Sequence, residues 1–146
     1  MKIDTTRFGN VEIEPDHLLH FPSGMLGLED CRHWVLLADA ETDGLGWLQS
    51  TVHAEIALAV VSPRRFVPDY QVRISRGELA ALELADLRDA HLLAILGKGE
   101  QGITLNLKAP VVINLQRRLG RQVITNGDLP IQYPLAKQPV TLRKSA

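Results

Sequence analysis

Short runs rich in Val, Ile, Leu and aromatic residues recur along most of this chain. Gly, Pro, Asn or Asp separates many of them, and these residues favour turns. Each run has the length and composition of a β-strand. The runs lie at residues 34–38, 47–52, 57–61, 70–74, 91–96, 103–107, 111–114 and 122–125.

A further pair of alternating runs lies at residues 3–7 and 11–14. Phe8, Gly9 and Asn10 separate them, and Gly and Asn tolerate the positive φ that a tight hairpin turn needs. With this hairpin the chain carries about ten strands, more than one open sheet usually holds without curling or splitting into two layers. We therefore predict an all-β fold, either a compact β-barrel or a two-layer sandwich.

Helical patterning is confined to residues 76–84. Ser75 and Glu78 have the spacing of a capping box, and Leu79 and Leu82 supply an apolar side. The sequence therefore predicts one short helix.

Glycines crowd residues 97–102, between two β-like runs, and predict a hairpin turn there. The Gly97-Lys98 pair alone does not make a phosphate-binding loop. The upstream glycine, the Ser or Thr after the lysine and the following helix are all missing.

Length and composition predict a single domain. The chain has 146 residues, of which 45% are hydrophobic and 23% charged, and these values are close to the globular average. A domain of this size buries roughly 70% of the surface that its unfolded chain exposes. We assign residues 1–136 to the domain and residues 137–146 to a mobile tail.

The N-terminal residues, the cysteine content and the charge pattern indicate where the protein is located and which ligands it is unsuited to bind. Residues 1–5 lack the apolar run of a signal peptide or membrane helix. Cys31 is the only cysteine, which suits a reducing compartment, so we expect a cytoplasmic protein. The net charge is −1, and the cluster Arg117, Arg118 and Arg121 has no aromatic neighbour in the sequence. This pattern argues against direct nucleic-acid binding.

Four side chains form the best candidate metal site, namely His17, His20, Cys31 and His33. His17 and His20 converge only if that segment forms a helical turn, because side chains three apart on a strand point to opposite faces. Structural zinc sites normally show two tight ligand pairs, and the second pair here is irregular. We therefore expect no bound metal. Cys31 could be a nucleophile if a histidine lay beside it, but a buried hydrophobic role is favoured.

Five peptides in order carry a family resemblance: RFGNV at residues 7–11, FPSGMLGLE at 21–29, WLQS at 47–50, FVPDY at 66–70 and NLKAPVVIN at 106–114. Together they resemble the flagellar assembly factor family, FliW, over about residues 2–124. NLKAPVVIN is the most specific of the five. Met25 and Leu28 depart from the family pattern, and the chain after Asp128 matches it poorly.

The resemblance implies a compact β-barrel-like fold without catalysis or a cofactor. It also implies two protein partners, flagellin and the translational regulator CsrA. In this family flagellin binding frees CsrA to repress flagellin translation, while free FliW antagonises CsrA, so that synthesis follows secretion. Alternatives of a different class are a small RNA-binding β-barrel and a zinc-dependent enzyme.

We expect the partner contact at Phe66, Pro68, Asp69 and Tyr70, where two aromatics flank a Pro-Asp turn and could anchor an interface. The alternative is that both aromatics pack into the core. Trp34 and Trp47 are expected in the core. Structural roles are expected for the other motif residues: Phe8, Gly9, Phe21, Pro22, Gly24, Gly27, Gln49, Ser50, Asn106, Pro110 and Asn114.

Overall fold

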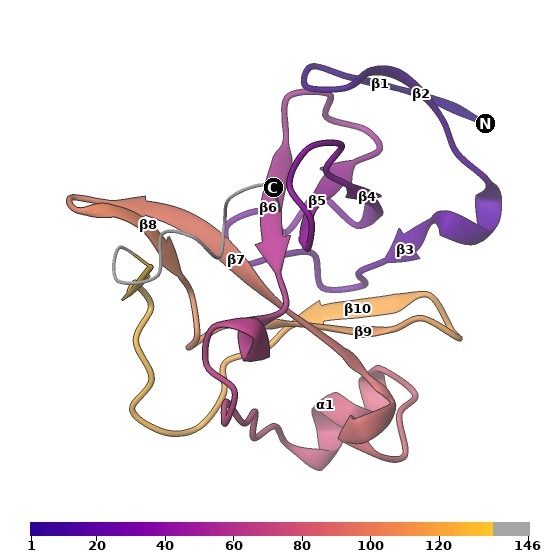
Figure 1. The fold of residues 1–146 in the computed structure, drawn as a ribbon. Coiled ribbons are helices and arrows are strands. Elements are labelled where there is room, and N and C mark those ends of the chain that lie inside the picture. The colour runs from indigo at the N-terminus through magenta and orange to yellow at the C-terminus, as the bar shows by residue number, and fades with distance from the viewer. Residues whose placement is uncertain (136–146) are drawn as a thin grey trace.

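Strands that are distant in sequence close into a barrel (Figure 1). The computed structural model describes residues 1–135. The strands are β1 (Lys2–Thr5), β2 (Gly9–Glu12), β3 (Leu19–His20), β4 (His33–Ala38), β5 (Leu45–Ser50), β6 (Ala57–Val61), β7 (His91–Gly99), β8 (Gly102–Leu105), β9 (Val111–Asn114), β10 (Leu119–Gln122) and β11 (Tyr133–Pro134).

The barrel order is β7-β6-β5-β4-β3-β10-β9, and β9 pairs back onto β7 to close the ring. All neighbours in this ring are antiparallel except β3 and β10, which are parallel and paired only through Leu119 and His20. The second half of β7 leaves the ring and pairs with β8, which in turn pairs with β11. The predicted mostly β fold is therefore confirmed, in its barrel form.

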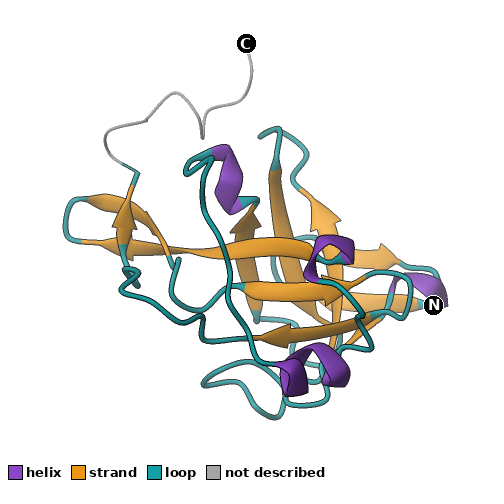
Figure 2. Cartoon of the chain, turned by 90° about the horizontal axis from the view of Figure 1, so that it is seen from below, coloured by secondary structure: helices purple, strands orange, loops and turns teal. Residues whose placement is uncertain are grey.

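Helical structure in the described residues is limited to α1 (Arg76–Ala81) and the 3-10 turns Pro15–His17, Pro63–Arg65 and Leu87–Asp89. Figure 2 shows these short helices around the strands. Ser75 Oγ accepts a hydrogen bond from Glu78 N at 3.1 Å, so the capping residue is the expected one. The helix is shorter than predicted because Glu83 has a φ of 55°, which turns the chain out of the helix.

The apolar side chains form three clusters. Trp34, Leu48 and Ile113 fill the barrel, with Phe21 beside them at 0% exposure. A second cluster lies on the outer side of β6, β7 and β9, where the chain between residues 63 and 90 covers Ala94 and Val112. The third lies under the β1–β2 hairpin and is formed by Ile3, Ile13, Val35 and partly buried neighbours. Successive residues of one strand therefore pack in different clusters, because their side chains point to opposite faces of the sheet.

Two predicted strands were placed wrongly. Residues 70–74 form no strand, because Arg73 bonds the Thr125 side chain and the Asn126 backbone in place of a strand neighbour. The strand predicted at 122–125 lies at Leu119–Gln122. Val123 N still donates to the Pro110 carbonyl at 3.0 Å, but proline has no N–H to return the bond, so the ladder ends there. The predicted tail at 137–146 lies outside the described residues.

Candidate protein-binding surfaces

The segment expected to contact a partner divides into buried and exposed parts. Phe66 and Tyr70 are only 4% and 3% exposed, and both belong to the outer core cluster. The Tyr70 hydroxyl also donates to the Leu107 carbonyl at 2.6 Å. Pro68 and Asp69 between them are exposed. The two rings therefore have the core role that was the alternative, and the Pro-Asp turn is the part that a partner can reach.

A groove of about 430 Å³ lies beside this turn. One wall includes Asp69 and Arg73, and the other is formed by residues 126–129 with Asp128. Lys108 Nζ donates to the Gly127 carbonyl at 2.6 Å and so ties the second wall to the segment before β9. The groove has acidic and basic side chains at its rim, which is typical of a polar protein contact.

A second candidate surface lies where the tip of the β1–β2 hairpin meets β5. The Arg7 guanidinium carbon lies 4.0 Å from the centre of the Trp47 ring, and the Phe8 ring meets the same indole edge-on at 6.1 Å. Arg7 is exposed, while Phe8 and Trp47 are half-buried. We name these three residues the aromatic patch. Arg and aromatic residues are enriched at the centres of interfaces.

Asp39 fixes the position of the Trp47 indole in the aromatic patch by a hydrogen bond. Trp47 Nε1 donates to its carboxylate at 3.0 Å, and the backbone N–H groups of Glu41 and Thr42 donate to the same carboxylate. The indole bond, with these backbone bonds, lowers the pKa of Asp39 below its usual value. Trp47 is thus held at the surface, half-buried. The prediction that it lies in the core was wrong. This surface was not predicted from the sequence; Arg7 and Phe8, directly before the Gly-Asn turn, are the feature that could have pointed to it.

Gln49 and Ser50 organise the turn after β5, which contacts the β1–β2 hairpin through Thr6. Gln49 is fully buried, and its Nε2 donates to the carbonyls of Ser50 and Ile56 at 3.0 and 3.1 Å. Ser50 Oγ accepts from the N–H groups of Val52 and His53. These bonds shape the β5–β6 connection, which also accepts Thr6 N at the Ala54 carbonyl.

The other motif residues lie in turns and in the core. Gly9 has a φ of +72° at the start of β2. Gly24, with a φ of +65°, leaves no room for a side chain, because a Cβ would lie 2.5 Å from the Glu29 carbonyl oxygen. Gly27 also has positive φ, and Pro22 is exposed before this turn. Phe21 lies in the barrel.

The NLKAPVVIN segment is held by its two asparagines. Asn106 Oδ1 accepts from Lys108 N and Ala109 N at 3.1 and 2.9 Å. Asn114 is buried, and its Nδ2 donates to the Leu82 carbonyl at 2.8 Å, which joins β9 to the end of α1. Pro110 is buried directly before β9. A backbone this firmly bonded is a scaffold for the surfaces around it.

The four candidate metal ligands are only partly brought together. Cys31 is buried at 5% exposure, whereas His20 and His33 are exposed and their rings stack with centroids 5.0 Å apart. His17 lies in the first 3-10 turn. Within residues 1–135 no group of three or more His, Cys, Asp or Glu side chains is placed to hold a metal ion.

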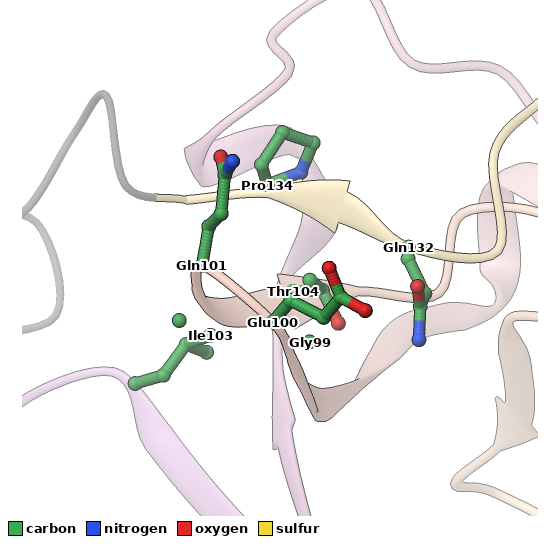
Figure 3. Close-up of a pocket in the computed structure, with 8 residues that line it drawn as sticks. Gly99, Glu100, Gln101, Ile103, Thr104, Gln132 and Pro134 are labelled. Atoms are coloured by element: carbon green, nitrogen blue, oxygen red, sulfur yellow. The ribbon is translucent and has the colours of Figure 1, made fainter.

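The glycine-rich turn forms the predicted hairpin between β7 and β8. A hollow of about 300 Å³ lies against it, and Figure 3 shows the residues of the turn and of β11 that line it. Thr104 lies at its base and is buried, and Glu100 is the only ionisable side chain among the lining residues. Such a lining offers no positive charge for a phosphate. No helix in the described part of the chain is long and apolar enough to span a membrane.

Comparison with known proteins identifies the family. The FliW protein family model matches residues 2–135. A flagellar assembly factor FliW from Natranaerobius thermophilus is 34% identical over 100% of this chain and 99% of the relative. Another from Bdellovibrio bacteriovorus is 38% identical over 92% of this chain and 79% of the relative.

The fold agrees with a solved structure. The crystal structure of a flagellar assembly factor FliW superimposes with a TM-score of 0.83 at 28% identity, and the match covers 92% of this chain and 98% of that one. The family match extends beyond residue 124, where the motif resemblance ended, and includes β11. This chain therefore belongs to the FliW family.

Proposed function

We propose that this chain is a non-enzymatic flagellar assembly factor of the cytoplasm that binds two proteins, flagellin and the translational regulator CsrA. The chain without bound flagellin antagonises CsrA. When flagellin binds the chain, CsrA is released and represses flagellin translation. Synthesis of flagellin then follows its secretion. The observation that carries this proposal is the family match over residues 2–135, since the curated relatives are named flagellar assembly factors.

Two surfaces of the chain support a role in binding proteins. The aromatic patch offers Trp47 and Phe8 with a cation beside them. The Pro68-Asp69 turn offers a polar rim along the groove described above. The aromatic patch has the composition of an energetic centre, whereas exposed charges at a rim mainly affect association rate and selectivity. We therefore place the main contact at the aromatic patch and a secondary contact at the turn.

Calorimetric titration of the purified chain with flagellin and with CsrA tests the proposal. Both proteins should bind, and saturating flagellin should displace CsrA. Arg7→Ala and Trp47→Ala should each weaken the main contact by about 2 kcal/mol or more, the scale of an interface hot spot. Binding of neither protein at low salt would refute the proposed function.

Matched variants separate the surface from the fold. Leu115 is an exposed apolar residue in the β9–β10 turn, and Leu115→Ala should leave both affinities unchanged. Arg7 is exposed, so Arg7→Ala should bind less without a change in melting temperature. If Leu115→Ala weakens binding as much as Trp47→Ala does, the assignment of the main contact to the aromatic patch is wrong.

A further inference from the structure

Two exposed histidines face each other from neighbouring strands of the barrel, one of them on its shortest strand, β3. His20 on β3 is directly opposite His33 on β4 in the antiparallel register. Both side chains are exposed, and their rings lie 5.0 Å apart and within 13° of parallel. Histidine is the commonest metal ligand in proteins, so two adjacent imidazoles suit a metal ion.

The register explains why the rings are so close. His20 N points away from β4 and donates to the Arg118 carbonyl at 2.8 Å, while Phe21 N donates to the Arg32 carbonyl at 2.7 Å. His20 and His33 are therefore a non-hydrogen-bonded pair of the β3–β4 ladder. Side chains of such pairs approach more closely than those of hydrogen-bonded pairs. The backbone register thus places the two imidazole rings side by side on one face of the ladder.

The preference of imidazole nitrogen for certain metals indicates which ion this pair would bind. A zinc ion bound by histidine lies about 2.0–2.1 Å from the ring nitrogen, so both exposed rings must turn a nitrogen toward the same ion to bind it. Imidazole is a good ligand for zinc, copper and nickel, and affinity rises toward copper. No third side-chain ligand stands ready in residues 1–135, so water would complete the coordination. We propose that His20 and His33 form a two-histidine site for a divalent ion of late first-row transition metals.

The location gives this site a structural effect. β3 has two residues, and its link to β10 in the ring is the single pair of Leu119 and His20. Figure 1 shows β3 between β4 and β10. An ion bound by His20 and His33 joins β3 to β4, so it holds the two-residue strand β3 in the ring on the side opposite its single pair with β10. A metal ion that binds the folded chain and not the unfolded chain raises the free energy of unfolding by mass action.

Titration of the full, tag-free chain with nickel chloride tests the proposal. The expected result is one site per chain and a melting temperature that rises with nickel concentration. His20→Gln and His33→Gln should each lower the nickel affinity on the order of 10²-fold, because the second ligand no longer acts intramolecularly. Both should also abolish the nickel-dependent rise in melting temperature. If one variant fails to fold, the other still provides the test.

His53→Gln and His91→Gln are the matched controls, since both residues are exposed histidines on other parts of the fold. They should bind nickel as the unaltered chain does. The proposal is overturned if these controls lose as much affinity as the two test variants. It is also overturned if the His20→Gln, His33→Gln double variant binds nickel as tightly as the unaltered chain. Neither result depends on flagellin or CsrA binding.

Discussion

The hydroxyl of Tyr70 donates a hydrogen bond of 2.6 Å to the backbone carbonyl of Leu107. Tyr70 and Leu107 are 3% and 2% exposed. The bond joins the segment before α1 to the NLKAPVVIN segment, two of the peptides that carried the family resemblance. It also shows why a tyrosine, which needs a partner for its hydroxyl when buried, occurs in the FVPDY peptide as a core residue.

Tyr70→Phe should destabilise the chain by about 1–2 kcal/mol, because a buried carbonyl loses its partner while the ring stays in place. Urea denaturation measures this difference through the transition midpoint. Tyr133 is a partly buried tyrosine outside this contact, and Tyr133→Phe is the control. A Tyr70→Phe chain as stable as the unaltered one would show that the bond contributes nothing.

Tyr70 should also make stability fall at alkaline pH. Burial raises the pKa of Tyr70 from 10.0 to about 12, against a smaller lowering by Arg64. Between these two values the unfolded chain releases the phenolic proton and the folded chain keeps it, so stability decreases as pH rises. The contribution is complete below pH 10 and is lost as pH rises through about 12. Urea midpoints at several pH values should decline more steeply for the unaltered chain than for Tyr70→Phe; parallel declines would contradict this.

Phe66→Ala should change stability and Asp69→Ala should change binding, because Phe66 is buried and Asp69 is exposed. Truncation of the buried ring should cost about 3–5 kcal/mol of stability. Asp69→Ala should leave the melting temperature unchanged and slow association with a partner. Thermal unfolding and stopped-flow binding measure the two effects. A stable Phe66→Ala chain would mean that Phe66 is not a core residue.

Gly120→Ala should destabilise the barrel, because a Cβ at this position would overlap the fully buried ring of Phe21. Overpacking of this kind typically costs about 1–3 kcal/mol. Phe21→Leu in the same chain should recover part of the loss by making room, and a double-mutant cycle measures this coupling. Additive effects of the two changes would show that the clash is relieved elsewhere.

Glu83→Gly should stabilise the chain by about 1 kcal/mol, since Glu83 has a φ of 55°, where a Cβ is unfavourable. The change also removes an exposed ion pair with Arg117 at 3.5 Å, which contributes little. Glu83→Ala loses the same ion pair but keeps the Cβ, so it is the control. Chemical denaturation should rank Gly above Ala; the reverse order would exclude backbone strain at this position.

Local features of the sequence were enough to predict most elements. The Gly-Asn turn, the capping pair Ser75 and Glu78 and the glycine-rich turn at residues 97–102 act through neighbours along the chain. The structure has the corresponding hairpins and helix. The misplaced strand at residues 70–74 has the right alternation, with Tyr70 and Val72 buried. Alternation reports burial, however, and not whether a neighbouring strand is present to pair.

The sequence by itself determined the β-rich composition, the turns and the family, because turn chemistry and motif order are properties of adjacent residues. Tertiary structure decided which strands close the ring, as in the pairing of His91 with Ile113. It also decided that Trp47 lies at the surface beside Arg7 and that His20 meets His33. These contacts depend on strand register, and a shift of one residue would turn each side chain to the opposite face.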